Sequence, residues 1–568
     1  MNSIPPAPVF VNAGGVENKR KEGHPVNASA RIREYMQNHG ARYTLHRLSQ
    51  IGRQRLLGSY DRRRARELTP PEELQKQREN QPAGPRISVV VPIYNTDPRM
   101  LREMLDSLSA QTLQDFEAVL YDGGSTRAET KAILDELSDP RFRVIHAEEN
   151  RGISGNTNAA VKEARGDYIA LLDHDDLLTP DALWRMADFL SREDADIVYS
   201  DEDRIMENSR HHMDPHYKPD WNPETLVSDN YICHLAVIRK TLLEETGLRT
   251  GFDGSQDHDL FLRLGEKTSN IRHIPRVLYS WREVKSSRSH LDLQTCLESS
   301  CRAAEEHEAA LGRKVDAVPV RKAIRLWYEV DPETRVEALI HGESEEACRA
   351  CLEELNRCTS WRNFSAALIV TDSESRFSSL NEAAAGSEAD VLLLLEAGVW
   401  GMNRHFIREL LMYAQMENIA GVTPVLTDET GRITHGGFAV GLDSGAGCIH
   451  ENLRASAGGL YDIMNKVHNV SAVSPCCMMV RKDMWADFDP AYRSGLAGAD
   501  LGLRQLRNGR RFVITPHATA IREKDPLLLS GNVRDEKDLR LFREKWGSDI
   551  EDPCYSPNFG KKKADYKF

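Results

Sequence analysis

The segment DYIALLDHDD (residues 167–176) passes directly from apolar residues into three aspartates and one histidine. Its short apolar part predicts a buried strand in a layered α/β domain. Carboxylates held at the end of a rigid strand can bind a hard divalent cation, and such a cation neutralises a diphosphate. A solvated acidic loop is the simpler explanation of the motif taken alone, so the surrounding sequence has to distinguish the two.

Strands and helices alternate on the N-terminal side of this segment. ISVVVPI (87–93) is a continuous apolar run and predicts a buried parallel strand. EAVLYD (117–122) predicts a second strand that ends on Asp122, and RVIHAEEN (143–150) predicts a third. In such sheets, ligands bind beyond the carboxyl ends of the strands. We therefore expect Asp122 and the 173–176 cluster to share one edge of the sheet.

Length and composition restrict the class of protein. The chain has 568 residues, of which 40% are hydrophobic and 28% are charged, and this is enough for two or three large globular domains. No uninterrupted apolar stretch reaches about 18 residues, and the N-terminal segment MNSIPPAPVFVNAGGVENKRK lacks the apolar core of an export signal. These features predict a cytoplasmic protein without a membrane-spanning helix. The net charge of −13 argues against nucleic acid as the main partner.

The N-terminal region is basic. Between Arg31 and Arg66 lie ten arginines against only two acidic residues, with apolar residues interleaved in a pattern that predicts helix. One interpretation is a solvated helix or linker packed on the main body. The other is an arm that lies on the anionic inner face of a membrane. Because a Pro- and Gly-containing linker follows, we assign residues 1–85 to a basic N-terminal arm and linker.

Residues 86 to about 290 resemble an inverting glycosyltransferase of family 2, which has the GT-A fold for nucleotide-diphosphate sugars. Order and spacing of the motifs agree along the whole segment, and the resemblance implies a catalytic domain over 86–315. The matching pieces are VVVPIYN (89–95), YDGGST (121–126), ENRGISGNTNAAV (149–161), GDYIALLDHDDLL (166–178), YSDEDRI (199–205), YKPDWNPE (217–224), GSQDHDLFLRL (254–264) and HIPRVLYSWR (273–282).

The resemblance implies a nucleotide-diphosphate sugar as donor, with UDP- and dTDP-sugars as the expected kinds. In this family, Asp122 would hydrogen-bond the base and Asn158 would lie near the sugar. The residues implied to contact the donor are Pro92, Tyr94, Asp122, Asn158 and Asp173.

For the reaction, the resemblance implies that Asp173 and Asp175 form an Asp-X-Asp motif, that Asp175 binds Mg²⁺ or Mn²⁺, and that Asp257 is the catalytic base. The chemistry needs both sets, because a sugar hydroxyl is a poor nucleophile until its proton is taken and a departing diphosphate needs charge compensation. Taken alone, Asp257 would be explained as a helix N-terminal carboxylate. The family's usual acidic residues are absent at Gly123 and Gln256. Candidates for auxiliary or acceptor-side roles are Asp201, Asp203, Asp259, Trp281 and Arg282.

The pattern begins again after residue 330, which indicates an internal duplication. We call residues 86–315 the first copy and residues 330–545 the second copy. The repeated pieces are FSAALIVTD (364–372), NEAAAGSEADVLLLLEAGV (381–399), HNVSAVSPCCMMVRKDMW (468–485) and GLAGADLGLRQL (495–506), which match the segments 117–122, 158–176, 228–243 and 254–264.

The second copy lacks the working residues. Asp173-His174-Asp175 corresponds to Glu396-Ala397-Gly398, and Asp257 corresponds to Gly498. We predict that the second copy is catalytically silent and serves as a scaffold or an acceptor-binding domain. A second, metal-independent transferase is the alternative.

A deletion accompanies this loss. Asn158 follows Asp122 by 36 residues, whereas Asn381 follows Asp372 by only 9. The missing residues fall on the nucleotide-binding side of the fold, which favours a silent second copy.

The sequence therefore predicts two tandem α/β domains of the GT-A type and a C-terminal tail (546–568) packed on the second copy. The predicted function is metal-dependent, inverting transfer of a sugar to a glycan or lipid-linked glycan in cell-surface polysaccharide synthesis, in the cytoplasm or at the inner face of the membrane. One alternative is a sugar-nucleotide nucleotidyltransferase, but its glycine-rich phosphate loop is missing. Another is a non-catalytic nucleotide-sugar-binding or scaffold protein of a polysaccharide assembly complex.

Overall fold

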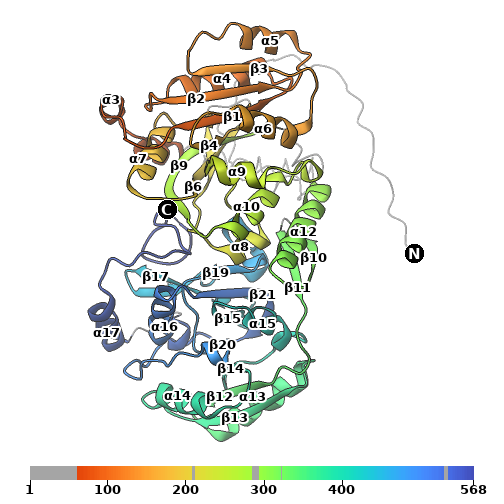
Figure 1. Ribbon diagram of the computed structural model, residues 1–568. Coiled ribbons are helices and arrows are strands. Elements are labelled where there is room, and N and C mark those ends of the chain that lie inside the picture. Colours follow the sequence, from red (N-terminus) through yellow and green to blue (C-terminus); the bar gives the residue numbers. More distant parts are fainter. Residues whose placement is uncertain (1–59, 208–210, 285–292, 322, 530–534, 568) are drawn as a thin grey trace, which may run out of the picture. The chain divides into compact units, whose positions relative to one another are not determined.

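The computed structural model describes residues 60–207, 211–284, 293–321, 323–529 and 535–567. Arg66–Phe568 forms one compact unit that contains the two large sheets described below (Figure 1). Most of the predicted basic arm lies outside the described residues. None of the helices in the described part of the chain has the length and apolar character that a bilayer crossing requires.

A nine-stranded sheet forms the first copy. The order along it is β3-β2-β1-β4-β8-β6-β9-β5, with β7 paired to β6. β1 pairs in parallel with β2 and places Ile93 beside Asp122, so both strands end at one edge of the sheet. The strands are β1 (Ile87–Ile93), β2 (Phe116–Asp122), β3 (Phe142–His146), β4 (Tyr168–Leu171), β5 (Leu177–Leu178), β6 (Ile197–Met206), β7 (His212–His216), β8 (Ala236–Arg239) and β9 (Ile271–Glu283).

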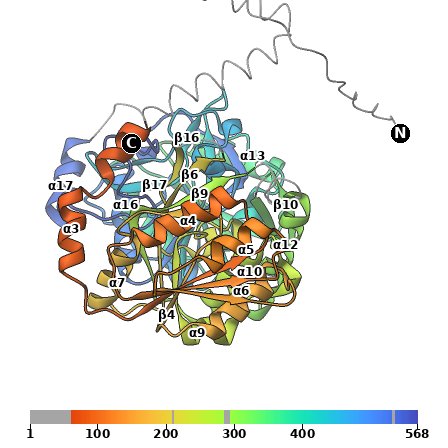
Figure 2. The same ribbon diagram turned by 90° about the horizontal axis from the view of Figure 1, so that it is seen from above.

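β1 is buried on both faces, as its continuous apolar sequence predicts. Val89 and Val91 belong to the core that α4 and α7 cover, whereas Val90 belongs to the core that α6, α9 and α10 cover. Figure 2 shows α4 and α9 on opposite sides of the sheet. The helices of this copy are α4 (Pro98–Ser109), α5 (Ala128–Asp135), α6 (Gly152–Glu163), α7 (Ala182–Arg192), α8 (Pro223–Ser228), α9 (Lys240–Thr246), α10 (Gln256–Lys267) and α12 (Leu293–Ala310), and α3 (Pro71–Glu79) precedes them.

The second copy contains an eight-stranded sheet in the order β13-β12-β14-β20-β15-β21-β19, with β16 paired to β15. A hairpin of β10 (Val315–Val320) and β11 (Ala323–Tyr328) precedes it. Its strands are β12 (Val336–Gly342), β13 (Phe364–Val370), β14 (Val391–Glu396), β15 (Ile419–Thr427), β16 (Ile433–His435), β19 (His468–Val470), β20 (Cys477–Arg481) and β21 (Arg511–Ile521). The small hairpin β17 (Phe438–Leu442) and β18 (Gly445–Cys448) and the helices α13 (Glu345–Cys358), α14 (Arg376–Gly386), α15 (Phe406–Ala414), α16 (Leu496–Arg507) and α17 (Glu536–Trp546) surround it.

The two sheets share one topology, which confirms the tandem layout. The path β2-β1-β4-β8-β6-β9 of the first sheet corresponds strand by strand to β13-β12-β14-β20-β15-β21 of the second. The directions also agree: β4 runs antiparallel to β8, and β14 runs antiparallel to β20. β3 is the difference, because β13 is the edge strand of the second sheet as described. The sequence deletion therefore removed an edge strand, which a sheet can lose without interrupting its core.

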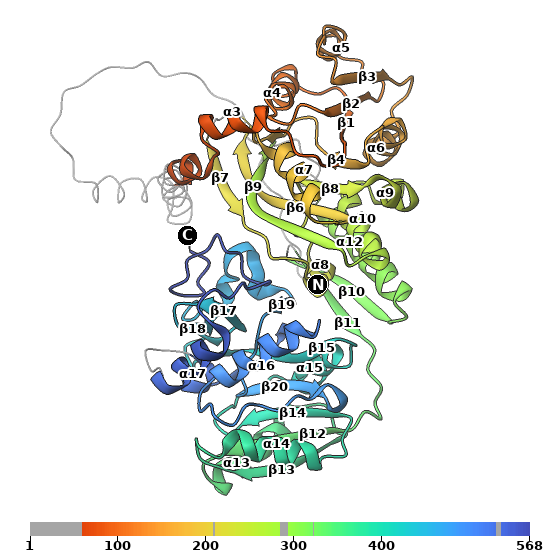
Figure 3. The ribbon, with the colours of Figure 1, turned by 60° about the vertical axis from the view of Figure 1, so that its left-hand side comes forward.

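The copies contact each other through α8 of the first and β19 and β21 of the second (Figure 3). Glu224, in α8, pairs with Arg511 at 2.7 Å and accepts a hydrogen bond from Asn469. The C-terminal tail joins both copies, since Asp552 accepts a hydrogen bond from Val440 N–H and Asn558 donates one to Asp201. The tail thus contacts the first copy as well as the second, on which the sequence placed it.

Candidate active site

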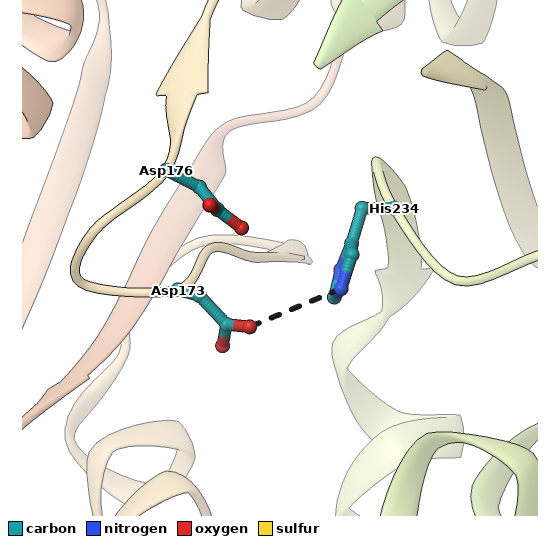
Figure 4. Close-up of side chains that lie close together, drawn as sticks. All are labelled: Asp173, Asp176 and His234. Atoms are coloured by element: carbon teal, nitrogen blue, oxygen red, sulfur yellow. Dashed lines mark ion pairs between the residues drawn. The ribbon is translucent and has the colours of Figure 1, made fainter. Parts of the chain in front are cut away.

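Asp173, Asp176 and His234 lie together at the carboxyl edge of β4 (Figure 4). One possible ligand atom from each lies within 4.8 Å of the others, and Nε2 of His234 is 3.9 Å from a carboxylate oxygen of Asp173. The pairing of β4 with β8 explains this meeting, because Ala170 lies opposite Val237 and the two chain segments continue into the aspartates and the histidine. Two carboxylates and an imidazole are ligands that Mn²⁺ or Mg²⁺ can accept.

Hydrogen bonds from β9 hold residues 173–176 in place, the segment that we call the acidic turn. Asp176 is buried and accepts hydrogen bonds from the hydroxyl of Tyr279 and from the N–H of Arg282, the latter at 2.6 Å. The side chain of Arg282 donates to the carbonyl of Asp175. Tyr279 also stacks on His234, with ring centroids 4.7 Å apart. Strand β9 therefore orients both the acidic turn and His234. We call Asp173, Asp176 and His234 the candidate cation group.

The acidic turn lacks enough positive charge of its own. Burial raises the pKa of Asp176 well above its usual range, and the charges of Asp175 and Asp173 raise it further. Burial also raises the pKa of Asp175, although His174, 3.7 Å from its carboxylate, opposes this. A bound cation would relieve this repulsion, so the turn favours one.

In the structure, Asp176 and His234 lie beside Asp173. The family resemblance had instead implied Asp175 as the cation ligand next to Asp173. His234 was missed because it lies 61 residues beyond Asp173 and no motif of the sequence marks it. The only available signal was its position directly before an apolar segment, Leu235 to Ile238, that could pair with the aspartate-bearing strand. Strand pairing, which the sequence did not specify, brings this candidate ligand to Asp173.

Asp257 lies in the first turn of α10, and Gln256 donates a hydrogen bond to its carboxylate at 3.2 Å. Burial raises the pKa of Asp257 to about 6; the charge of His234 opposes this shift, and that of Asp173 adds to it. The charges of His234 and Asp173 thus both act on the Asp257 carboxyl group. A carboxyl group with this pKa can accept a proton near neutral pH.

Three of the predicted donor residues, Pro92, Tyr94 and Asp122, lie at or just beyond the carboxyl ends of β1 and β2. Asp122 is buried, and its carboxylate accepts a hydrogen bond from Ser125 N–H and lies 3.0 Å from Nδ1 of His146. Pro92 lies beside Tyr121 in the sheet, and Tyr94, just beyond the strand, is 42% exposed. Tyr94 is therefore available to an incoming ligand, whereas Asp122 also organises the turn that follows β2.

Asn158 has a structural task that explains its presence in both copies. Its amide accepts from the N–H of Leu248 at 2.9 Å and donates to the carbonyl of the same residue at 2.7 Å. Asn381 makes the same pair of bonds with Phe488 in the second copy, at 3.0 and 2.8 Å. An amide that satisfies a backbone donor and acceptor is needed for the fold wherever the loop persists.

The auxiliary candidates divide into two groups. Asp201, Asp203 and Asp259 are buried among the contacts of the fold; Asp259, for example, pairs with Arg263 at 2.6 Å, as Asp500 pairs with Arg504 in the second copy. Trp281 packs against the guanidinium of Arg204 at 4.8 Å, and Arg282 supports the acidic turn. Of the five candidates, Arg282 is the one whose contacts, as described, include the Asp173–Asp176 turn.

In the second copy an arginine occupies the equivalent site. Arg522, which follows β21, pairs with Glu396 at 2.7 Å. A Cβ atom added at Gly398 would lie 2.9 Å from the guanidinium carbon of Arg522, and one added at Gly498 would overlap the carbonyl of Val473. The single carboxylate already has a cationic partner, a side chain at position 398 would have to displace Arg522, and one at 498 would clash with backbone, so this site as described does not favour a bound cation.

Comparison with known proteins gives one family. The family described as Glycosyl transferase family 2 matches residues 88–247. The chain is 33% identical to "Uncharacterized protein y4gI" of Sinorhizobium fredii over 85% of its own length and 58% of that protein. It is 30% identical to "O-antigen biosynthesis protein RfbC" of Myxococcus xanthus, over 84% of its own length and 40% of that protein. It is 31% identical to "Uncharacterized glycosyltransferase YwdF" of Bacillus subtilis, over 36% of its own length and 77% of that protein. The chain thus spans about half the length of the first two relatives.

Proposed function

The chain belongs to glycosyltransferase family 2, and we propose that its first copy transfers a sugar from a nucleotide-diphosphate sugar to a glycan or a lipid-linked glycan. The proposed setting is the synthesis of a cell-surface polysaccharide, which the O-antigen biosynthesis relative supports. The observation that carries the proposal is the meeting of Asp173, Asp176 and His234 at the carboxyl edge of the sheet, with one possible ligand atom from each within 4.8 Å of the others.

The donor set suits a divalent cation, Mg²⁺ or Mn²⁺. Asp173, Asp176 and His234 would hold it in the described arrangement, and Asp175, implied by the family resemblance, is the further proposed ligand. When bound, the cation would supply positive charge to the diphosphate of the donor. Arg282 and Tyr279 keep the acidic turn in place through Asp176.

Asp257 is the proposed catalytic base. It would take the proton of the acceptor hydroxyl as that oxygen attacks the anomeric carbon, and the bond from this carbon to the diphosphate would break on the opposite face, which inverts the centre. The partial burial of Asp257 suits this role because a carboxylate with a raised pKa is a stronger base.

The donor is proposed to be selected at the carboxyl ends of β1 and β2. Tyr94 and Pro92 would line the nucleotide site and Asp122 would contact a uracil or thymine base, which makes UDP- and dTDP-sugars the proposed donors. Asn158 would act through the loop at Leu248 rather than by direct contact, because both polar atoms of its amide are bonded to that residue. Trp281 remains the proposed acceptor-side residue, and the buried Arg282 is proposed to be auxiliary through its support of the acidic turn.

The second copy is proposed to be a silent scaffold that holds the first copy and the acceptor, and residues 31–66 are proposed to contact the inner face of the membrane from the cytoplasm. A non-catalytic role in nucleotide-sugar binding is the competing function. The intact set of Asp173, Asp175 and Asp257 favours the enzyme.

The test is a thermal-shift screen of UDP- and dTDP-sugars with Mn²⁺, followed by an assay of nucleoside diphosphate release with and without lipid-linked acceptors. A cognate donor at a hundred times its Kd should stabilise the protein by about 2.7 kcal/mol. Release that is lost in Asp257→Asn, while donor binding persists, would support catalysis. Donor binding without release in any acceptor condition would favour the non-catalytic role, and neither binding nor release would contradict both.

A further inference from the structure

Tyr461 of the second copy holds a segment of the first. It lies in the 3-10 turn η3 (Leu460–Asn465), with a φ of 56° that few non-glycine residues adopt. Its hydroxyl accepts a hydrogen bond from the N–H of Tyr217 at 3.1 Å and donates one to the carbonyl of Pro215. Its ring lies 4.5 Å from the ring of His216. The side chain of this one residue therefore contacts three consecutive residues of the first copy, 215–217.

The same segment continues into the support of His234. Nδ1 of His216 lies 3.5 Å from one carboxylate oxygen of Glu202, and Nζ of Lys218 lies 3.3 Å from the other. Lys218 is fully buried and donates hydrogen bonds to the carbonyls of Ile232 and His234. Glu202 in turn accepts the N–H of His234 at 3.2 Å. Both backbone polar groups of His234 are thus bound by the Glu202–Lys218 pair.

The buried Glu202–Lys218 ion pair links the position of residues 216–218 to that of the backbone at 232–234. Lys218 has no access to water, so a lost hydrogen bond would leave a buried charge partly unsatisfied. The Lys218 ammonium and the 232–234 backbone therefore have to move together. The position of residues 215–218 consequently governs that of His234.

We infer that Tyr461 is a positioning residue through which the second copy sets the place of His234 in the active site of the first. The path runs from Tyr461 through residues 215–218 and the Glu202–Lys218 pair to the backbone of His234. The structural part of this inference stands on the contacts alone, and its consequence for cation binding rests on the proposed function. On this inference, the second copy supports the active site of the first even though it is proposed to be catalytically silent.

Amide hydrogen exchange on the full chain tests the structural part without any ligand. Tyr461→Ala removes the hydroxyl and the ring, and Tyr461→Phe removes only the two hydrogen bonds. We expect peptides covering 231–236 to exchange at least tenfold faster in Tyr461→Ala and about threefold faster in Tyr461→Phe, with peptides of β12 and β14 unchanged. The matched control is Tyr492→Phe, because Tyr492 is buried in the second copy and its hydroxyl has no hydrogen-bond partner among the described residues.

Calorimetric titration with Mn²⁺ alone, without donor or turnover, tests the consequence. Mutation of a group that orients a metal ligand typically lowers the affinity for the metal by about 10- to 100-fold. Tyr461→Ala should therefore weaken Mn²⁺ binding about tenfold, and Tyr492→Phe should leave it unchanged. Unchanged exchange at 231–236 in both folded Tyr461 variants would overturn the inference whatever Mn²⁺ does. Faster exchange in a protein whose wild-type form binds no Mn²⁺ would support the positioning role and count against the proposed cation site.

Discussion

The guanidinium of Arg522 lies 2.7 Å from the carboxylate of Glu396 in the second copy, whereas the corresponding edge of the first copy gathers Asp173, Asp176 and His234. Both side chains are 15% exposed. This ion pair is a nearly buried structural contact of the second copy, and it has measurable consequences.

Arg522→Met should destabilise the protein by about 3 kcal/mol, because it leaves a nearly buried carboxylate without its partner. Burial already raises the pKa of Glu396, and Arg522 opposes this, so the loss should be greater at high pH, where the unpaired carboxylate has to be ionised. Urea denaturation at pH 5 and pH 8 measures both effects. The matched variant Glu396→Gln in the same background should restore most of the stability, and a lack of rescue would contradict this role for the pair.

Asp257→Asn should abolish transfer and yet stabilise the fold. Burial raises the pKa of Asp257 from 3.8 to about 6, so the folded state holds its proton more tightly than the unfolded chain does. The ionisation penalty is absent below pH 3.8, grows as the pH rises through 6 and is then constant. Removing it should add about 2 kcal/mol at pH 8, after allowance for partial exposure, and almost nothing at pH 4. Equal stability of the two proteins at pH 8 in thermal or urea unfolding would be incompatible with this.

The pH dependence of kcat/KM should show an acidic limb near pH 6, since Asp257 has to be ionised to accept a proton. Activity should therefore fall as the pH drops below that value. Asp173 contributes to the raised pKa, so a cation at Asp173 should move the limb to lower pH. Rate profiles at limiting and saturating Mn²⁺ test the shift, and a limb that moves upward would argue against coupling of these two sites.

Asp175→Asn and Asp176→Asn distinguish the two versions of the cation site. We expect each to weaken Mn²⁺ binding about tenfold, but only Asp176→Asn should also lower the melting temperature, because Asp176 anchors Tyr279 and Arg282. Calorimetry and thermal unfolding on the same samples separate binding from stability. Wild-type Mn²⁺ affinity in Asp175→Asn would remove that residue from the ligand set.

Asn158→Ala and Asn381→Ala form a natural pair of variants. Each leaves a backbone N–H and a backbone carbonyl without their amide partner, so each should destabilise the protein by about 2 kcal/mol. Only Asn158→Ala should change the KM for the donor, because the second copy, which contains Asn381, is proposed to be silent. An altered donor KM in Asn381→Ala would show that the second copy takes part in donor binding.

The sequence determined much of this protein by itself. Continuous apolar runs such as 87–93 specified the buried strands, because burial on both faces of a sheet requires apolar side chains at every position. The repeated order of motifs specified the tandem layout, and the glycines at 398 and 498, where the first copy has Asp175 and Asp257, led to the prediction that the second copy is silent. All of these are local patterns or ordered series of them.

Only the tertiary structure decided which distant side chains meet. His234 became a candidate ligand because β8 pairs antiparallel with β4, and Arg522 became the substitute for a cation because β21 ends beside Glu396. The support that Tyr461 gives to residues 215–217 likewise depends on how the second copy packs on the first. Such contacts join residues separated by tens to hundreds of positions, and their energy depends on the packing of whole sheets, which no local pattern of amino acids records.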